Sequence, residues 1–340
     1  MAGISRTVAS AEEPDDVIDS EVIIVGGGPA GSSCAWKLNQ KGVETIVLDK
    51  KTFPGLKLCA GWITPKVLKD LELKKEDYPH SLLTFEKLHY SFNGKKLALR
   101  TRQYSLRRSE FDHWLLERSR VPVHHHLVNH IRREQGHYII DDLFRCNYLV
   151  GAGGTTCPVY RTFFKDTNPR ARELRIIAME EEFLYDYQDQ NCYLWFYDGN
   201  LPGYAWYVPK GDGYLNIGIG GKFTLLRDRK ETIRDHWNRF IQKLESLSLV
   251  KHHSFNPRGG DYYLRQKLEV GRLDNAFITG DAAGLATLDM GEGIGPAVES
   301  GILAAMAIIT GSPYSLKSVA KYSFMRILLP WWNGRRPWPA

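Results

Sequence analysis

The feature that most constrains this chain is a glycine-rich stretch directly after a run of β-branched residues. Residues 22–25 (VIIV) predict a strand that is buried on both faces. Gly26, Gly28 and Gly31 then form the spacing G-x-G-x-x-G. In this spacing the first glycine permits a tight turn, the second lets a pyrophosphate approach the backbone, and the third allows close packing of helix on strand. The stretch therefore predicts a dinucleotide-binding unit.

The next residues complete that unit. A helix that begins at Pro29 and Ala30 directs its unpaired N–H groups and its positive dipole end toward the phosphates. Residues 45–48 predict a second strand, and Asp49 at its end, with Lys50 beside it, lies where ribose hydroxyls bind. A 2′-phosphate would be repelled by Asp49. This unit alone does not decide between NAD and FAD.

Length and composition indicate a globular protein with one large domain or two interleaved ones. Of the 340 residues, 43% are apolar, which is enough for a large core. The longest purely apolar run, residues 302–309, is too short to cross a bilayer, and no secretion signal is visible. We therefore expect a cytoplasmic location. The net charge of +6 is mild and no basic run is interleaved with aromatics, so we expect no nucleic-acid partner.

The spacing of the candidate metal ligands disfavours a metal site. The five cysteines are widely scattered and include no C-x-x-C pair. Consecutive side chains on a strand point to opposite faces, so His124, His125 and His126 cannot all converge on one ion. His130 could share a face with two of them, but no nearby carboxylate or cysteine completes a shell. A solvated edge strand is the favoured interpretation.

Two predicted hairpins indicate a second, antiparallel sheet. Residues 87–100 alternate apolar and polar side chains around an Asn-Gly turn, and residues 203–221 alternate around a Gly-Asp-Gly turn. In the second hairpin Tyr204 and Trp206 lie on one face, which is most often sheet core. A helical pattern over residues 225–247 should pack on the outside of this sheet.

Two further segments carry side chains that suit a bound cofactor. Cys59 lies in a loop rich in glycine and proline, where it is either a small buried hydrophobe or a thiol that faces the cofactor. Arg107 and Arg108 flank the start of a helix that Ser109 should cap, where a guanidinium could reach a phosphate or a flavin edge. A surface position for Arg107 is the alternative.

A last glycine-rich segment follows another predicted strand, residues 276–279. Gly280 and Asp281 end that strand, and Asp281 can bond a ribityl or ribose hydroxyl. The loop then leads into a helix that begins near Gly293 and Ile294, and whose N-terminus can face developing negative charge.

Taken together, these motifs resemble the FAD-dependent oxidoreductases of the p-hydroxybenzoate hydroxylase fold. The similar stretches are GGGPAG with its acid at Asp49, RSEFD at a helix start, GAGGTTCP, and TGD followed by GEGIG. Within that group the chain most resembles the geranylgeranyl reductase family. Two stretches carry the narrower match: KLCAGWITP is similar to the family's cysteine loop beside the flavin, and GYAWYVPKGDGYLNIGIGG to its substrate-tunnel strand.

The resemblance implies a mixed α/β fold, in which a Rossmann-like FAD-binding domain is interleaved with an antiparallel β-sheet substrate domain. It also implies roles for single residues. Gly26, Gly28 and Gly31 would hold the pyrophosphate, Asp49 the adenosine ribose, Asp281 the linker, and Gly293 with Ile294 the pyrimidine ring; Arg107 would lie near the flavin, and Cys59, Tyr204 and Trp206 would border the substrate.

The expected domain limits follow the motifs. Residues 20–80, 105–165 and 258–313 should form the FAD domain, and residues 81–104 and 166–257 the substrate domain. Residues 1–19 predict a disordered acidic leader. Residues 314–340 form a basic and aromatic tail that either ends in a helix packed on the core or makes peripheral membrane contact.

The resemblance implies reduction of carbon–carbon double bonds in a prenyl or similar apolar substrate, by hydride transfer from N5 of reduced FAD. An alkene also needs a proton, for which Cys59 and Tyr204 are the candidate donors. NADPH or a reduced protein would supply the electrons. Two alternatives stay open: a monooxygenase or halogenase acting on an aromatic substrate, since YAWYVP partly matches the halogenase pattern W-x-W-x-I-P, and a prenyl-binding escort protein without redox chemistry.

Overall fold

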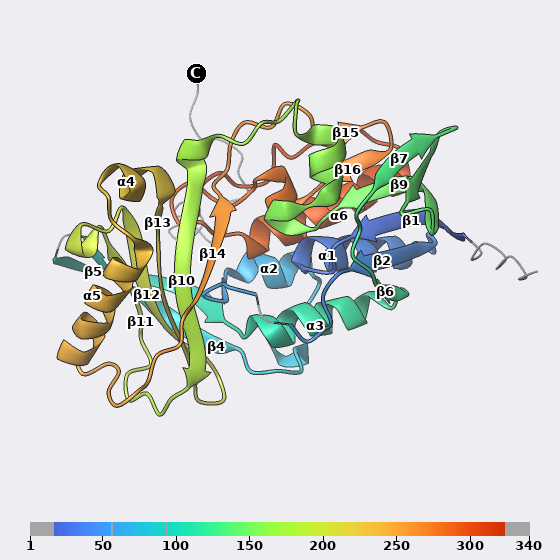
Figure 1. Ribbon diagram of the computed structural model, residues 1–340. Helices are drawn as coiled ribbons and strands as arrows, with labels where there is room; N and C mark the ends of the chain where they lie inside the picture. Colours follow the sequence, from blue (N-terminus) through green and yellow to red (C-terminus); the bar gives the residue numbers. More distant parts are fainter. Residues whose placement is uncertain (1–16, 56, 93, 324–340) are drawn as a thin grey trace, which may run out of the picture.

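The computed structural model describes residues 17–55, 57–92 and 94–323. The strands form two eight-stranded sheets that lie on opposite sides of the molecule. Helices α2 (Pro65–Asp70) and α3 (Arg108–Ser119) lie in the region between them (Figure 1). The mixed α/β architecture expected from the sequence is confirmed.

The first sheet is the nucleotide-binding type of sheet that the glycine motif predicts. Its strand order is β15-β16-β9-β1-β2-β6, with β8 joined to β9 and β7 to β8. The strands from β16 to β6 run parallel, so their carboxyl ends meet along one edge. Its members are β1 (Ile18–Val25), β2 (Thr45–Asp49), β6 (Val123–His125), β7 (Ile131–Glu134), β8 (His137–Ile140), β9 (Phe144–Gly151), β15 (Arg272–Leu273) and β16 (Ala276–Ile278).

Both faces of β1 are buried, as its continuous run of β-branched residues predicts. Val22 and Ile24 pack against α1 (Pro29–Asn39) and α6 (Ile294–Thr310), whereas Ile23 and Val25 pack on the opposite face. This double burial fixes β1 and the loop that follows it relative to α1.

The second sheet has the order β14-β10-β13-β12-β11-β4-β5-β3 and is antiparallel except for the β11–β4 pair. Both predicted hairpins are confirmed, as β4–β5 and β12–β13. Its members are β3 (Trp62–Ile63), β4 (Leu83–Phe92), β5 (Lys95–Ser105), β10 (Arg175–Leu184), β11 (Cys192–Phe196), β12 (Gly203–Pro209), β13 (Tyr214–Lys222) and β14 (Arg258–Tyr263).

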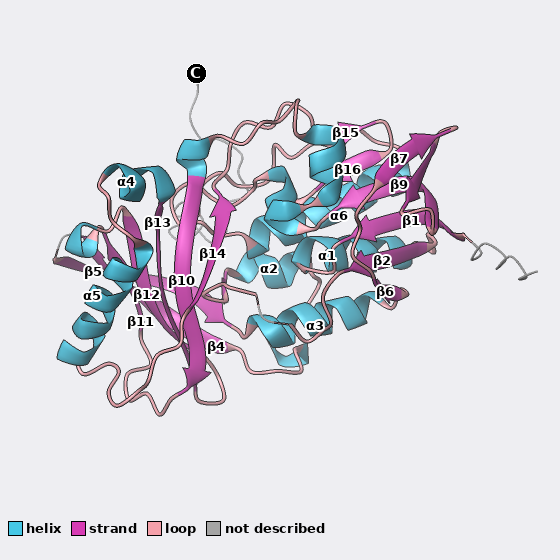
Figure 2. Cartoon of the chain, in the orientation of Figure 1, coloured by secondary structure: helices cyan, strands magenta, loops and turns pink. Residues whose placement is uncertain are grey.

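The helix expected over residues 225–247 packs on the outer face of the second sheet, but as two helices rather than one. These are α4 (Phe223–Asp228) and α5 (Ile233–Ser246), which cover the face turned away from the first sheet (Figure 2). The break has a local cause, because the Thr232 hydroxyl accepts a hydrogen bond from the backbone of Asp235 and starts a new helix there.

A second correction concerns the start of α3. The helix begins at Arg108, so Arg107 is its N-terminal flanking residue and Ser109 lies inside the first turn instead of capping it. In the part of the chain that the structure describes, every helix is too short or too polar to cross a bilayer.

The expected domain limits stay a prediction, and three boundary elements refine them. Strands β3 and β14 pair with the second sheet although they lie in segments assigned to the FAD domain. Strand β1 begins at Ile18, inside the predicted leader, and the carboxylate of Asp19 pairs with Arg145. The tail expectation falls mostly on residues 324–340, outside the described residues, and no helix is present among residues 314–323.

Candidate functional site

The loop after β1 forms a cradle at the N-terminus of α1. Gly26 has a φ of +113°, which a side chain would disfavour, and it turns the chain away from the strand. A Cβ atom at Gly31 would lie 1.8 Å from the carbonyl oxygen of Gly26, so only glycine permits this helix-to-loop contact. A Cβ atom at Gly28 would meet no atom within 4 Å. The helix also lacks a side-chain cap, so its first N–H groups remain for a ligand.

Asp49 lies beside this cradle at the carboxyl end of β2. Its Oδ2 accepts a hydrogen bond from the backbone N–H of Gly27 at 2.6 Å, and its Oδ1 accepts one from Lys51 at 2.8 Å. These bonds fix the carboxylate, which keeps further lone pairs for hydroxyl donors. An uncapped helix N-terminus next to an oriented carboxylate fits the pyrophosphate and ribose of a dinucleotide.

The glycine-rich segment from Gly280 to Gly293 lines the same cavity as the loop after β1. A short turn, Gly280–Ala283, follows β16, and the backbone N–H of Gly280 donates to Ser300 Oγ at 2.9 Å. The Asp281 carboxylate lies 3.5 Å from Lys57 Nζ. Helix α6 starts after Gly293, again without a side-chain cap.

One cavity of about 590 Å³ brings these segments together. Of the residues expected at the cofactor, those that line it are Gly26, Gly28, Pro29, Ala30, Asp49, Lys50, Gly280, Asp281, Gly293 and Ile294. Gly31 does not line it, which agrees with a packing role. Turns that are more than 200 residues apart in the sequence thus meet around a space that fits a flavin nucleotide.

Arg107 does not line this cavity, in contrast to the expectation that it lies near the flavin. Its guanidinium donates to Glu110 at 2.6 Å and to Glu182 at 3.0 Å, and it stacks on Tyr214. The neighbouring Arg108 lines the cavity instead and forms a buried bidentate pair with Asp112, at 2.8 and 2.6 Å. The helix cap was expected at Ser109, two residues after the observed flanking residue Arg107, and of the two arginines considered there Arg108 is the one that lines the cavity.

The far wall of the cavity is formed by the second sheet. The cavity is lined there by Tyr204, Trp206 and Tyr262 from the sheet, and by Cys59 and Met290 from neighbouring loops. The Tyr204 hydroxyl donates to the carbonyl oxygen of Met290 at 2.6 Å, and Trp206 Nε1 donates to Asn216 Oδ1 at 2.7 Å. Because these polar atoms already have partners, the two side chains offer the cavity mainly ring surface.

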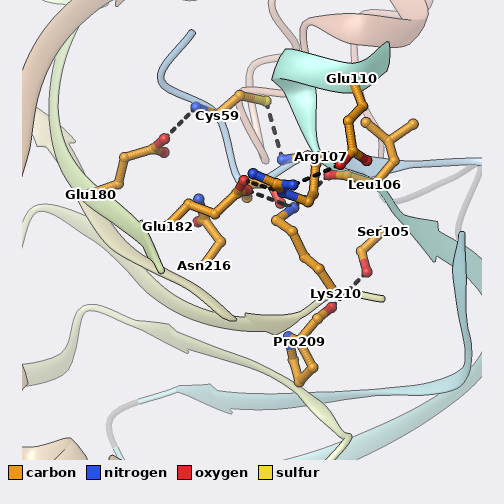
Figure 3. A network of polar contacts seen from close by, with 12 residues as sticks. Cys59, Ser105, Leu106, Arg107, Glu110, Glu180, Glu182, Pro209, Lys210 and Asn216 are labelled. Atoms are coloured by element: carbon orange, nitrogen blue, oxygen red, sulfur yellow. Dashed lines mark hydrogen bonds and ion pairs between the residues drawn. The ribbon is translucent and has the colours of Figure 1, made fainter. Parts of the chain in front are cut away.

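A buried lysine holds the Cys59 loop in place. Lys210 is fully buried, and its Nζ donates to the carbonyl oxygen of Ala60 at 2.6 Å. It also donates to the carbonyl oxygen of Leu106 at 2.6 Å (Figure 3). The thiol of Cys59 accepts a bond from the backbone of Gly61 at 3.4 Å. Burial lowers the pKa of Lys210, while the neighbouring carboxylates of Glu182 and Glu180 oppose that shift.

An acid that the sequence analysis missed also lies in this wall. Glu180 on β10 lines the cavity and is 5% exposed. Its Oε1 accepts a hydrogen bond from the backbone N–H of Cys59 at 2.7 Å (Figure 3). Burial raises the pKa of Glu180 to about 7, although the Cys59 N–H and Lys210 act in the opposite direction.

The available signal for Glu180 was the run MEEEF within a predicted strand. Since side chains alternate along a strand, the middle glutamate must point away from its two neighbours. At least one acid of the run therefore had to lie on the inner face of the sheet.

The histidines considered as metal ligands are engaged elsewhere. His126 lies 2.7 Å from the carboxylate of Asp141, and the ring of His124 packs against Phe144. Across residues 17–55, 57–92 and 94–323, no three His, Cys, Asp or Glu side chains are arranged to hold a metal ion.

Comparison with protein families and curated proteins gives consistent matches. Residues 24–89 match a family model described as an NAD(P)-binding Rossmann-like domain. An uncharacterized protein of Methanosarcina barkeri is 33% identical over 307 residues, which cover 85% of this chain and 74% of that protein. Digeranylgeranylglycerophospholipid reductase 2 of Methanosphaera stadtmanae is 25% identical over 330 residues, covering 90% of this chain and 82% of the reductase.

Solved structures with the same fold include a geranylgeranyl bacteriochlorophyll reductase-like protein of Thermoplasma acidophilum. The TM-score is 0.76 at 22% identity, covering 91% of this chain and 84% of that one. The flavin-dependent halogenase CmlS also matches, with a TM-score of 0.68 at 20% identity over 85% of this chain and 58% of the halogenase. At these identities the structural matches establish the fold.

A valine at position 28 should prevent FAD binding without unfolding the protein, because its side chain would enter the cavity at the phosphate position. For Gly28→Val we expect the affinity for FAD to fall at least about tenfold in fluorescence titrations of the apoprotein. The thermal midpoint of the apoprotein should not change. Gly31→Ala is the matched contrast, since its methyl group would meet the Gly26 carbonyl and lower stability itself. Normal FAD binding by Gly28→Val would contradict the assignment of Gly28 to the phosphate-binding position.

The raised pKa of Glu180 predicts a pH-dependent stability difference between the wild type and Glu180→Gln. The protonated carboxyl is favoured in the folded state, so its contribution is fully present below about pH 4.5 and is lost as pH rises to about 7. Relative to the wild type, the unfolding free energy of the Glu180→Gln apoprotein should therefore rise over this window, by up to about 3 kcal/mol. Urea denaturation at a series of pH values measures this difference.

The control for that series is Glu86→Gln, which removes an exposed glutamate paired with Arg102. Exposed pairs contribute little to stability, so this variant should follow the wild type at every pH. A Glu180→Gln curve parallel to the wild-type curve would contradict a raised pKa.

Replacement of Lys210 by methionine should loosen the Cys59 loop, because the carbonyls of Ala60 and Leu106 would lose their shared donor. We expect Lys210→Met to lose about 2 kcal/mol or more of unfolding free energy. Cys59 should also react faster with a thiol reagent, which reports on this loop because the other four cysteines are buried. Lys243→Met, which removes a partly exposed pair with Asp198, is the control and should leave the thiol rate unchanged.

Proposed function

Because this chain belongs to the geranylgeranyl reductase family of FAD-dependent oxidoreductases, we propose that it reduces carbon–carbon double bonds in the prenyl chains of a lipid. The observation that supports this most directly is the continuity of the cavity. A single space runs from the nucleotide cradle at Gly28 to the aromatic wall at Tyr204 and Trp206. A substrate at that wall would lie beside the flavin end of a bound FAD.

The wall suits an apolar chain more than a polar substrate. Tyr204 and Trp206 lie with their rings 5.7 Å apart, and their polar atoms are bonded to protein partners. Burial raises the pKa of Tyr204 well above its ordinary value, so the phenol stays neutral. Together with Met290 these groups offer apolar contact surface to a prenyl chain.

The residues of the cradle would hold FAD in a fixed orientation. Gly28 and the start of α1 would accommodate the pyrophosphate, Asp49 the adenosine ribose, and Asp281 the linker. The uncapped N-terminus of α6, at Gly293 and Ile294, would stabilise negative charge at the pyrimidine edge of the flavin. When bound and reduced, FAD supplies a hydride from N5.

The names of the curated relatives suggest a substrate class. Several are digeranylgeranylglycerophospholipid reductases, and we propose the same kind of lipid for this chain. NADPH or a reduced protein is the proposed source of electrons. Cys59, Tyr204 and Trp206 are proposed as residues that border the reacting prenyl chain.

An anaerobic single-turnover experiment tests this function. The FAD-loaded protein is reduced with dithionite and mixed with a digeranylgeranyl glycerophospholipid in detergent. We expect flavin absorbance to return as the lipid is added, and mass spectrometry to show that each reduced double bond gains two hydrogens. The saturated diphytanyl lipid is the matched control and should leave the flavin reduced.

Flavin that stays reduced with every prenyl lipid would contradict the proposal. Rapid reoxidation by oxygen with hydroxylation or halogenation of an aromatic compound would instead favour the monooxygenase or halogenase alternative. A purified protein that neither contains nor binds flavin would favour the escort alternative.

A further inference from the structure

The acidic side chains of strand β10 point to two different faces of the sheet, one toward the cavity and one toward α5. Ala178 and Glu180 line the cavity, whereas Met179 and Phe183 pack into the core beneath α5. Glu181 shares that second face and bonds His253 at 3.0 Å. Glu182 shares the face of Glu180 but bonds Arg107, so Glu180 is the carboxyl group of this strand that lines the cavity.

Glu180 lies next to the aromatic wall because of a glycine on the neighbouring strand. A Cβ atom at Gly218 would lie 2.1 Å from the Trp206 ring and 2.8 Å from Glu180 Cβ. The absence of a side chain there lets the indole ring and the glutamate come together above the backbone. Asn216 accepts the indole N–H, which fixes the ring in this position.

Three cations near Glu180 have acid partners of their own, and Arg258, opposite Glu180 on β14, lines the cavity with an exposed side chain. Arg107 bonds Glu182, and Lys210 Nζ lies 3.7 Å from Glu182 while it donates to two carbonyls. Arg108 is held by Asp112. Burial outweighs the opposing effects of the Cys59 N–H, Lys210 and Asn216 and raises the pKa of Glu180 to about 7, so the neutral carboxylic acid predominates below that pH. A neutral carboxylic acid can donate a proton.

The other groups in this wall are less suited to give up a proton. The Tyr204 hydroxyl is committed to the Met290 carbonyl, and burial raises the pKa of both Tyr204 and Tyr262. The sequence analysis considered Cys59 and Tyr204 for this role because it did not locate Glu180.

Building on the proposed function, we propose that Glu180 is the proton donor for double-bond reduction. One alkene carbon receives hydride from the reduced flavin, and the other receives the carboxyl proton of Glu180 as the π bond breaks. The products are the saturated bond, oxidised flavin and the Glu180 carboxylate, which regains a proton from solvent. An external two-electron donor, a reduced nicotinamide or a reduced protein, restores the flavin.

Glu180→Gln tests this role while it preserves the loop contact, because the amide oxygen can still accept the Cys59 N–H. We expect the variant to bind FAD and to be reduced by dithionite like the wild type. Lipid-dependent flavin reoxidation in stopped flow should slow at least about a hundredfold. Glu181→Gln, on the opposite face of β10, is the matched control and should react at the wild-type rate.

Infrared difference spectroscopy supplies a readout that does not depend on turnover. A protonated-carboxyl band should be present in the wild type at pH 6, disappear as pH is raised, and be absent from Glu180→Gln. Identical carboxyl bands in wild type and variant would overturn the proposal.

The kinetic outcomes separate this inference from the function on which it rests. If the wild type reduces the lipid and Glu180→Gln does so at a similar rate, the role of Glu180 is wrong and the function stands. If the wild type reduces no prenyl lipid while its flavin is fully reducible, the proposed function fails, and proton donation to a prenyl chain fails with it.

Discussion

The amino group of Lys210 ties the two halves of the site together. It reaches from the turn between β12 and β13 to the carbonyls of Ala60, in the loop before β3, and Leu106, between β5 and α3. Burying an ammonium group is costly unless it is fully bonded, so both carbonyls must stay within reach. This requirement fixes the spacing between the Cys59 loop, the start of α3 and the aromatic wall.

Much of the nucleotide half could be predicted because its signals are local. The β-branched run, the glycine spacing and the terminal acid each act within a few residues, and β1, α1 and β2 follow them closely. The same holds for the two hairpins, whose turns are short. The single helix expected over residues 225–247 was wrong, because the capping box at Thr232 competes with an otherwise continuous pattern.

The cavity wall around Glu180, Tyr204 and Trp206 was harder to predict from the sequence, because it depends on contacts between distant segments. Glu180 is bonded by the backbone of Cys59, more than 100 residues earlier, and lies beside Trp206 on another strand. Arg107 was expected at the cofactor, yet Glu182 draws it away and Arg108 lines the cavity. Which of two adjacent arginines lines the cavity depends on acidic partners that lie far away in the sequence, so the local pattern cannot predict it.

The order of elements along the chain limits how this protein can change. The described chain leaves the first sheet after β2, returns at β6, leaves again at β10 and returns at β15. Neither sheet thus corresponds to one continuous stretch of the described chain, so the exchange of a single continuous segment cannot replace a whole sheet. Changes in the wall of the cavity should therefore arise by point substitutions along β10 and β12, where single codons alter the lining side chains while the nucleotide cradle stays unchanged.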